Sequence, residues 1–207
     1  MSDFNIKDGI FVTYTGNETE VVIPDGVKSI GDNGFKGCTR LTRIEIPNSV
    51  KSIGDEAFRG CISLKEVSIP NSVMSIRKYI FKLCSSLTEV FIFHGIKSIG
   101  NKAFEGCTQL IRIKIPNGVT SIGGEAFRNC RILTRIEIPN SVKSIGDAAF
   151  ACCNLIEVVI PNGVKSIGDA VFARCLSLTD VSIPNSVTSI GEEAFMGCRP
   201  NKNYYTQ

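Results

Sequence analysis

Apolar side chains recur along the chain with a period of 23 residues. In the copy that starts at Leu41, one apolar set comprises Leu41, Ile44 and Ile46, and a second set comprises Val50 and Ile53. The alternation of apolar and polar residues in the first set predicts a short β-strand with one buried face. The second set predicts another extended segment, so each copy should contain two.

The residues that follow each set predict turns. Pro47 has no N–H to give to a strand ladder, so it should end the first strand and begin a Pro-Asn-Ser turn. Gly54 follows the second set and should change the chain direction. The acidic pair Asp55-Glu56 then opens a segment that ends at Cys61. This segment predicts about one turn of helix, with its acids near the positive end.

The copies align on a phenylalanine and on a cysteine three residues later. The phenylalanines are Phe35, Phe58, Phe81, Phe104, Phe127, Phe150, Phe172 and Phe195. The cysteines are Cys38, Cys61, Cys84, Cys107, Cys130, Cys153, Cys175 and Cys198. One step has 22 residues instead of 23, and the residue missing between Cys153 and Leu155 indicates a loop there.

One copy is too small to bury its own apolar side, so the copies should stack into a solenoid with parallel strands. The pattern Leu-x-x-Ile-x-Ile at this period is typical of leucine-rich repeats. We therefore predict an α/β solenoid of eight coils over residues 18–198. Two alternating strands around Asp8-Gly9 predict an N-terminal hairpin cap over residues 1–17. Residues 199–207 form a C-terminal tail.

The stretch IPNSVKSIGDEAFRGCISLKEVSIP (46–70) resembles the BspA-like leucine-rich repeat, also called the Treponema pallidum type. The resemblance covers about residues 18–198, because Leu-x-x-Ile-x-Ile-Pro, Ser-Ile-Gly, Ala-Phe and Cys-x-x-Leu recur in order. It implies a parallel sheet on the concave face of the coil. It also implies a surface or secreted protein of bacteria or protists that adheres to host matrix proteins or other cells.

Composition excludes several classes of protein. The chain has 207 residues with a formal net charge of +3, which gives no reason to expect nucleic acid as a partner. No run of 18 apolar residues predicts a transmembrane segment. The opening MSDFNIKDGI does not look like a secretory signal segment. The compartment therefore stays open between a cell-surface or secreted location and the cytosol.

The nine cysteines favour a reduced compartment and a structural role. Each column position suits a small buried apolar residue, and a free thiol behaves as one. Disulfides between adjacent coils remain an alternative, because equivalent residues lie within the Cα range of such a bond. The chain has no Cys-x-x-Cys and a single histidine, His94, so we expect no metal site.

No catalytic motif is present. The sequence lacks Gly-x-Gly-x-x-Gly, Gly-x-x-x-x-Gly-Lys-Ser/Thr and Gly-x-Ser-x-Gly. His94 stands where other copies have a turn asparagine, so it reads as a surface residue. We therefore predict neither an enzyme nor a cofactor.

Binding in a repeat protein should involve the variable exposed positions, because the constant positions stack. Two exposed columns flank the inward residue of the first strand in each coil. The candidate partner-binding residues drawn from these columns are Arg43, Glu45, Glu66, Glu89, Phe91, Arg112, Lys114, Arg135, Glu137, Glu157 and Asp180. The alternative is a ladder of ion pairs that only stabilises the sheet.

Segment 74–96 departs most from the repeat. Arg77 replaces the glycine, Lys78 and Tyr79 replace the acidic pair, Phe93 replaces the proline and His94 replaces the asparagine. Exposed aromatic side chains near a polar surface are typical of an interaction hot spot. Arg77, Tyr79, Phe93 and His94 thus form a candidate irregular patch, and neutral drift in one copy is the alternative.

Another column lies on the second extended segment of each copy and carries lysine in five coils: Lys28, Lys51, Lys97, Lys143 and Lys165. It either keeps a sheet edge soluble or attracts acidic glycans or a membrane surface. The last coil lacks a clear apolar cap. Three alternatives could cover it: Tyr204 and Tyr205, a second copy of the chain through end-to-end self-association, or sequence outside the 207 residues.

We therefore predict a non-enzymatic scaffold that binds a protein or glycan through its concave face, with surface adhesion as the leading role. An intracellular interaction or targeting module of a larger protein is the alternative.

Overall fold

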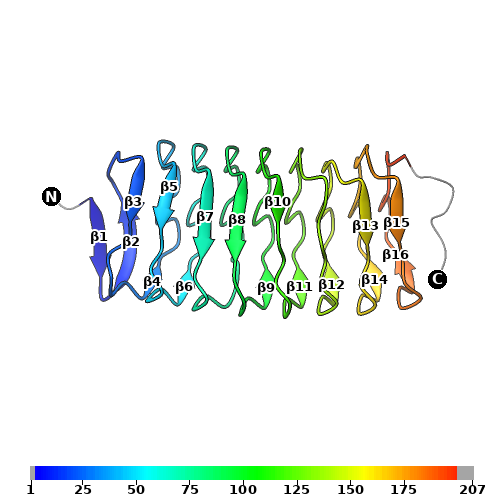
Figure 1. Cartoon of the computed structure of the whole chain (residues 1–207), viewed down its shortest axis with the longest axis horizontal. Helices are drawn as coiled ribbons and strands as arrows, with labels where there is room; N and C mark the ends of the chain where they lie inside the picture. Colours follow the sequence, from blue (N-terminus) through cyan, green and yellow to red (C-terminus); the bar gives the residue numbers. More distant parts are fainter. Residues whose placement is uncertain (1–2, 200–207) are drawn as a thin grey trace.

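The protein is a β-solenoid whose coils stack along one long axis (Figure 1). The computed structural model describes residues 3–199, so the predicted role of Tyr204 and Tyr205 lies outside the described residues. An N-terminal hairpin consists of β1 (Phe4–Lys7) and β2 (Ile10–Tyr14). The main strands are β3 (Glu20–Val22), β5 (Arg43–Glu45), β7 (Glu66–Ile69), β8 (Glu89–Ile92), β10 (Arg112–Ile113), β13 (Glu157–Val159) and β15 (Asp180–Ser182). The short strands are β4 (Ser29–Ile30), β6 (Ser52–Ile53), β9 (Ser98–Ile99), β11 (Ser121–Ile122), β12 (Ser144–Ile145), β14 (Ser166–Ile167) and β16 (Ser189–Ile190).

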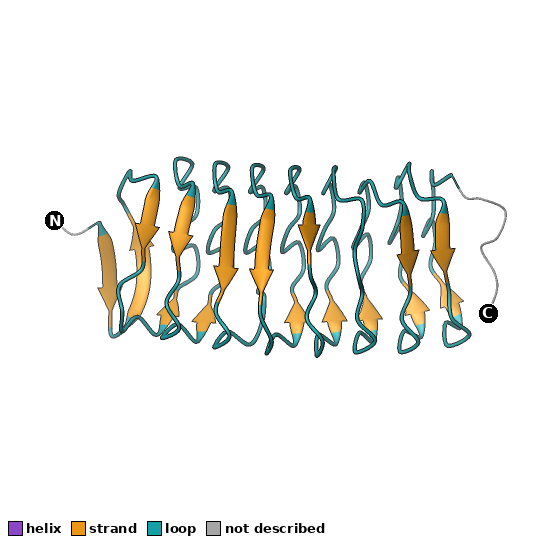
Figure 2. Ribbon diagram, in the orientation of Figure 1, coloured by secondary structure: helices purple, strands orange, loops and turns teal. Residues whose placement is uncertain are grey.

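The two kinds of strand form separate parallel ladders that run in opposite directions (Figure 2). Main strands pair in the order β3-β5-β7-β8-β10, and β13 pairs with β15. One coil lies between these two sheets, and its main-strand segment forms only an isolated bridge, in which Glu137 pairs with Lys114. The register joins equivalent residues, such as Glu20 with Arg43. The solenoid and the two extended segments of each coil are as predicted. The concave shape expected for the main-strand face remains a prediction.

The hairpin joins the short-strand ladder. β1 and β2 are antiparallel, and β2 pairs in parallel with β4. The Phe11 ring of β2 is fully buried and stacks on Phe35 with centroids 4.5 Å apart. The boundaries predicted for the hairpin, the solenoid and the tail remain predictions, and so does the capping role of residues 1–17.

A column of stacked phenylalanine rings forms the centre of the core. From Phe11 to Phe195 each ring faces the next one, with centroids 4.5–5.5 Å apart and planes within 16° of parallel. The coil rise sets this spacing, because adjacent parallel strands lie about 4.8 Å apart. Of the inward residues predicted for the copy that starts at Leu41, four are buried around this column: Leu41, Ile44, Val50 and Ile53. Ile46 is partly buried against the core.

The predicted short helix is wrong, and with it the α/β label: residues 3–199 contain no helix. Segments equivalent to 55–61 are successive turns. Glu56 and Gly60 adopt left-handed backbone with φ of 56° and 74°, which interrupts a right-handed helix. The Phe58 N–H donates to the Ile80 carbonyl of the next coil at 2.9 Å, instead of to a residue in its own turn. Bonding between coils therefore replaces the helix.

The cysteine column is also tied to the preceding coil. The Sγ of Cys61 donates to the Phe35 carbonyl at 3.1 Å, and the same bond recurs in each coil through Cys198 and Phe172. All nine cysteines are free thiols. The disulfide alternative is therefore not realised in this structure, and seven of the thiols donate to a backbone carbonyl instead.

Truncation of one ring tests the stacked column. Phe104 is fully buried between Phe81 and Phe127, so we expect Phe104→Ala to lower the free energy of unfolding by about 3–5 kcal/mol in urea titration. Phe93→Ala is the matched control, because Phe93 is 48% exposed and its loss should change stability little. A cost below about 0.5 kcal/mol for Phe104→Ala would mean that the stacking register is wrong.

A glycine at a left-handed turn position should stabilise the folded protein. Ala148 has φ 53°, where an L-residue costs about 1–2 kcal/mol. Glycine avoids this strain but loses more backbone entropy, so Ala148→Gly should raise the unfolding free energy by about 0.5–1 kcal/mol. Ala149→Gly at the buried neighbouring position should lower it. A destabilised Ala148→Gly variant, measured by the same urea titration, would contradict the assigned turn geometry.

Candidate functional site

The two predicted columns lie side by side along the outer face of the main strands, which we call the main-strand strip. The inward residues Val90, Ile113 and Ile136 are buried. Phe91 and Lys114, which follow Val90 and Ile113 along the chain, are exposed. The alternation predicted from the sequence therefore holds on this face. Short strands and turn segments occupy the other sides of each coil.

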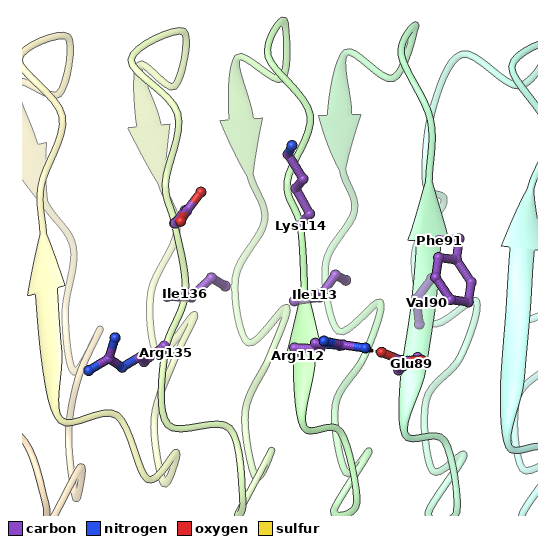
Figure 3. A pocket seen from close by; sticks show the side chains of 9 residues that line it. Glu89, Val90, Phe91, Arg112, Ile113, Lys114, Arg135 and Ile136 are labelled. Carbon is purple, nitrogen blue, oxygen red and sulfur yellow. Dashed lines mark hydrogen bonds and ion pairs between the residues drawn. The ribbon is translucent and has the colours of Figure 1, made fainter.

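An open depression of about 400 Å³ lies on the strip where three consecutive coils meet (Figure 3). Buried Val90, Ile113 and Ile136 lie beneath it. Six predicted binding residues surround it: Glu89, Phe91, Arg112, Lys114, Arg135 and Glu137. Arg43, Glu45 and Glu66 line a smaller hollow farther along the strip. Glu157 and Asp180 line neither hollow.

Only part of the strip is an ion-pair ladder. Arg112 pairs with Glu89 across adjacent coils, and Arg135 Nη1 lies 3.7 Å from Glu157 Oε1. Arg43, however, binds Glu45 of its own strand at 3.1 Å. These pairs are exposed and contribute little stability each.

Other charges on the strip lack an ion pair among residues 3–199. Glu66, Lys114 and Glu137 are exposed and belong to none of the ion pairs there. Glu66 lies opposite Glu89 on one side, an unfavourable placement of like charges, and opposite Arg43 on the other. Lys114 and Glu137 lie opposite each other across their bridge without forming an ion pair. The charges around the depression are therefore only partly compensated within the chain.

The irregular segment is divided between two faces. Phe91 is 44% exposed on the strip, and Phe93 is exposed just beyond the end of β8. Tyr79 instead lies in a turn, where the Lys82 and Lys102 ammonium nitrogens lie 5.5 and 6.0 Å from its ring centroid. The structure does not bring Arg77, Tyr79, Phe93 and His94 together as one patch.

Arg77 has a structural consequence that the sequence did not reveal. In regular coils a glycine packs against the coil before it: a Cβ at Gly54 would lie 2.5 Å from the Asp32 nitrogen. Arg77 cannot pack that closely. The short-strand ladder breaks between β6 and Ile76, which bridges only to Ile99, and it breaks a second time between β12 and β14. Arg77 binds Asp55 at 3.0 Å.

The cysteine column does not resemble a set of nucleophiles. Burial raises the pKa of the Cys107 and Cys175 thiols far above the usual range, and it raises the pKa of Cys38 to about 11. A reactive cysteine needs a lowered pKa and an accessible sulfur. His94 is exposed in a turn. Within residues 3–199 no group of three His, Cys, Asp or Glu is arranged to hold a metal ion.

Two parallel ladders, a proline turn and a stacked apolar core define a leucine-rich repeat solenoid. The family model for the BspA type leucine rich repeat region matches residues 5–132 and 87–202. The chain belongs to this family, as its repeat motifs predicted. Leucine-rich repeat scaffolds bind protein partners, so the family indicates a protein-interaction module. No helix in the described range is long and apolar enough to cross a membrane.

Solved structures agree with this assignment. A leucine-rich repeat protein of T. pallidum is 31% identical, with a TM-score of 0.65 over 94% of this chain and 85% of that one. A leucine-rich repeat protein of Bacteroides ovatus is 26% identical, with a TM-score of 0.55 over 94% and 78%. One from Eubacterium ventriosum shares the fold at 24% identity, with a TM-score of 0.63 over 96% and 49%. No curated protein matches the chain.

The buried thiols predict alkaline instability. A thiol whose folded pKa is raised contributes stability below its unfolded pKa, and loses that contribution as the pH rises toward the folded value. In reducing buffer, the free energy of unfolding should therefore fall above about pH 8.5, by up to about 1.4 kcal/mol per pH unit for each thiol whose pKa burial raises, such as Cys107 and Cys175. Cys107→Ala should reduce this slope by one thiol's share. Equal slopes between pH 8.5 and 9.5 for the two proteins would contradict the buried state of Cys107.

Proposed function

We propose that this protein is a non-enzymatic protein-binding scaffold and that its partner binds at the depression on the main-strand strip. The observation that carries the proposal is Phe91, a large aromatic side chain that is 44% exposed at the edge of this depression. Equivalent positions in neighbouring coils carry Ser68 and Lys114, so the aromatic ring is not part of the repeat.

The surroundings of Phe91 suit a protein interface. Interfaces bury a few aromatic anchors and surround them with polar residues. Here Glu89, Arg112, Lys114 and Glu137 provide acceptors and donors on both sides of the depression. The strand ladder holds these backbones in register, so little backbone order needs to be gained on binding.

The proposed role is adhesion at a cell surface to matrix proteins or to other cells. The resemblance to BspA-like proteins supports this role, and the partly uncompensated charges on the strip suit a polar protein ligand. An intracellular interaction or targeting module is the second candidate. The nine free thiols favour it, because free cysteines are typical of a reducing compartment.

Binding to fibronectin, fibrinogen and collagen at ~0.15 and ~0.5 M salt tests the proposal, because screening weakens charge-driven contacts more than packed ones. We expect saturable binding to at least one of them that survives the higher salt. Phe91→Ser should weaken it about tenfold or more without changing the melting temperature, as loss of an interface anchor would.

Val159→Ser is the matched control. Val159 occupies the same column as Phe91 on β13 and is 64% exposed, but it lies away from the depression. Equal effects of the two substitutions would refute the depression as the binding site. No binding across the panel would refute adhesion to these matrix proteins and favour the intracellular candidate.

A further inference from the structure

A second surface follows the short-strand ladder. The lysine row consists of Lys28, Lys51, Lys97, Lys143 and Lys165, all of them exposed. Backbone bonds between coils fix its register: the Lys51 N–H donates to the Lys28 carbonyl at 2.7 Å, and the Thr120 N–H donates to the Lys97 carbonyl at 2.8 Å. These lysines therefore follow equivalent short strands along the solenoid, although those strands form three separate sheets.

The lysines of this row form no ion pairs with the described residues. The structure contains ten ion pairs among residues 3–199, and none of them involves a lysine of the row. Every cation in those pairs lies on the strip or on the turn segments. Five lysines without an ion pair thus lie along one side of the coil, where the fields of successive lysines add.

The positions equivalent to the row in the other coils, and the position after each lysine, carry no charge. Met74, Thr120 and Thr188 take the lysine position in the other coils, and a serine follows it in every coil. In the preceding turn, Asp25 is the one acid among asparagines and a histidine. An acidic column that includes Asp32 and Asp147 begins four residues after the row. Their carboxylates accept backbone N–H groups of the next coil, at 2.7 Å for Asp32 and 3.0 Å for Asp147.

We propose that the lysine row binds a linear acidic polysaccharide that carries sulfate or carboxylate groups. At about 4.8 Å per coil, Lys51, Lys97 and Lys143 are spaced by about 10 Å, and the whole row spans about 29 Å. A chain of regularly spaced anions can follow such a line and contact each ammonium group in turn. The serine hydroxyls beside the row can donate further hydrogen bonds to it.

The width of the row favours this ligand over other polyanions. A flat anionic bilayer would also meet the acidic column next to the row, whereas a single chain can lie along the lysines alone. Single-stranded nucleic acid is bound through stacking on aromatic side chains, and the row contains none. The row and the main-strand strip belong to separate ladders of the coil (Figure 2), so the two ligands need not compete.

Binding of the full chain to heparin and to polygalacturonate, from 0.05 to 0.3 M NaCl, tests the proposal. Heparin presents sulfates together with carboxylates, and polygalacturonate presents carboxylates alone, so stronger binding to heparin would indicate a preference for sulfate. The variant with Lys51→Gln, Lys97→Gln and Lys143→Gln should lose at least about tenfold in affinity. Its slope of log K against log salt should be smaller by about two to three, since each ionic contact contributes roughly one.

A variant with Arg40→Gln, Lys65→Gln and Arg131→Gln is the matched control. It loses the same charge from exposed residues off the row that belong to none of the ion pairs in the described part of the chain. We expect it to retain nearly all of its affinity, and Phe91→Ser to bind the polysaccharide as the unmodified protein does. Equal losses in the two triple variants would overturn the proposal. So would absence of binding at 0.05 M NaCl, or preferential binding to phosphatidylserine vesicles.

Discussion

The structure depends on the stacking of equivalent side chains at the rise of one strand. Phenylalanine rings from Phe11 to Phe195 face one another at 4.5–5.5 Å, and the backbone ladders on both sides of the coil have the same rise. A side chain at a core position must therefore match its equivalents above and below. This constraint explains why phenylalanine, cysteine and the inward aliphatic residues recur, and why no single coil could be stable alone.

The same constraint limits where function can lie. A ladder places like residues in a row, whereas a catalytic site needs unlike groups that converge. Positions that leave the repeat without disturbing the stack are therefore the informative ones. Phe91 adds an exposed ring to the strip, and the unpaired lysines add a line of charge to the opposite ladder. Arg77 leaves the repeat at a packed position and breaks the short-strand ladder there.

The period and the identity of the inward residues were sufficient to predict the solenoid, its strands and its buried columns. The helix predicted for residues 55–61 was wrong, because the acidic pair there resembled the start of a helix. The amides of Phe58 and Gly60 bond to the next coil instead, and a pattern within one copy contains no information on such bonds. The depression also escaped prediction, because it forms where three coils meet. The division of segment 74–96 between two faces depended on turn geometry in the same way.

Residue-resolved thiol labelling of the native protein, followed by mass spectrometry, tests the common register most directly. Six column thiols are buried in the stack: Cys61, Cys84, Cys107, Cys130, Cys153 and Cys175. The half-buried Cys152 lies outside the column and provides an internal reference. We expect all six to label much more slowly than Cys152, and to reach unfolded-protein rates only in denaturant. Rapid native labelling of most of the six would contradict a continuous stacked core.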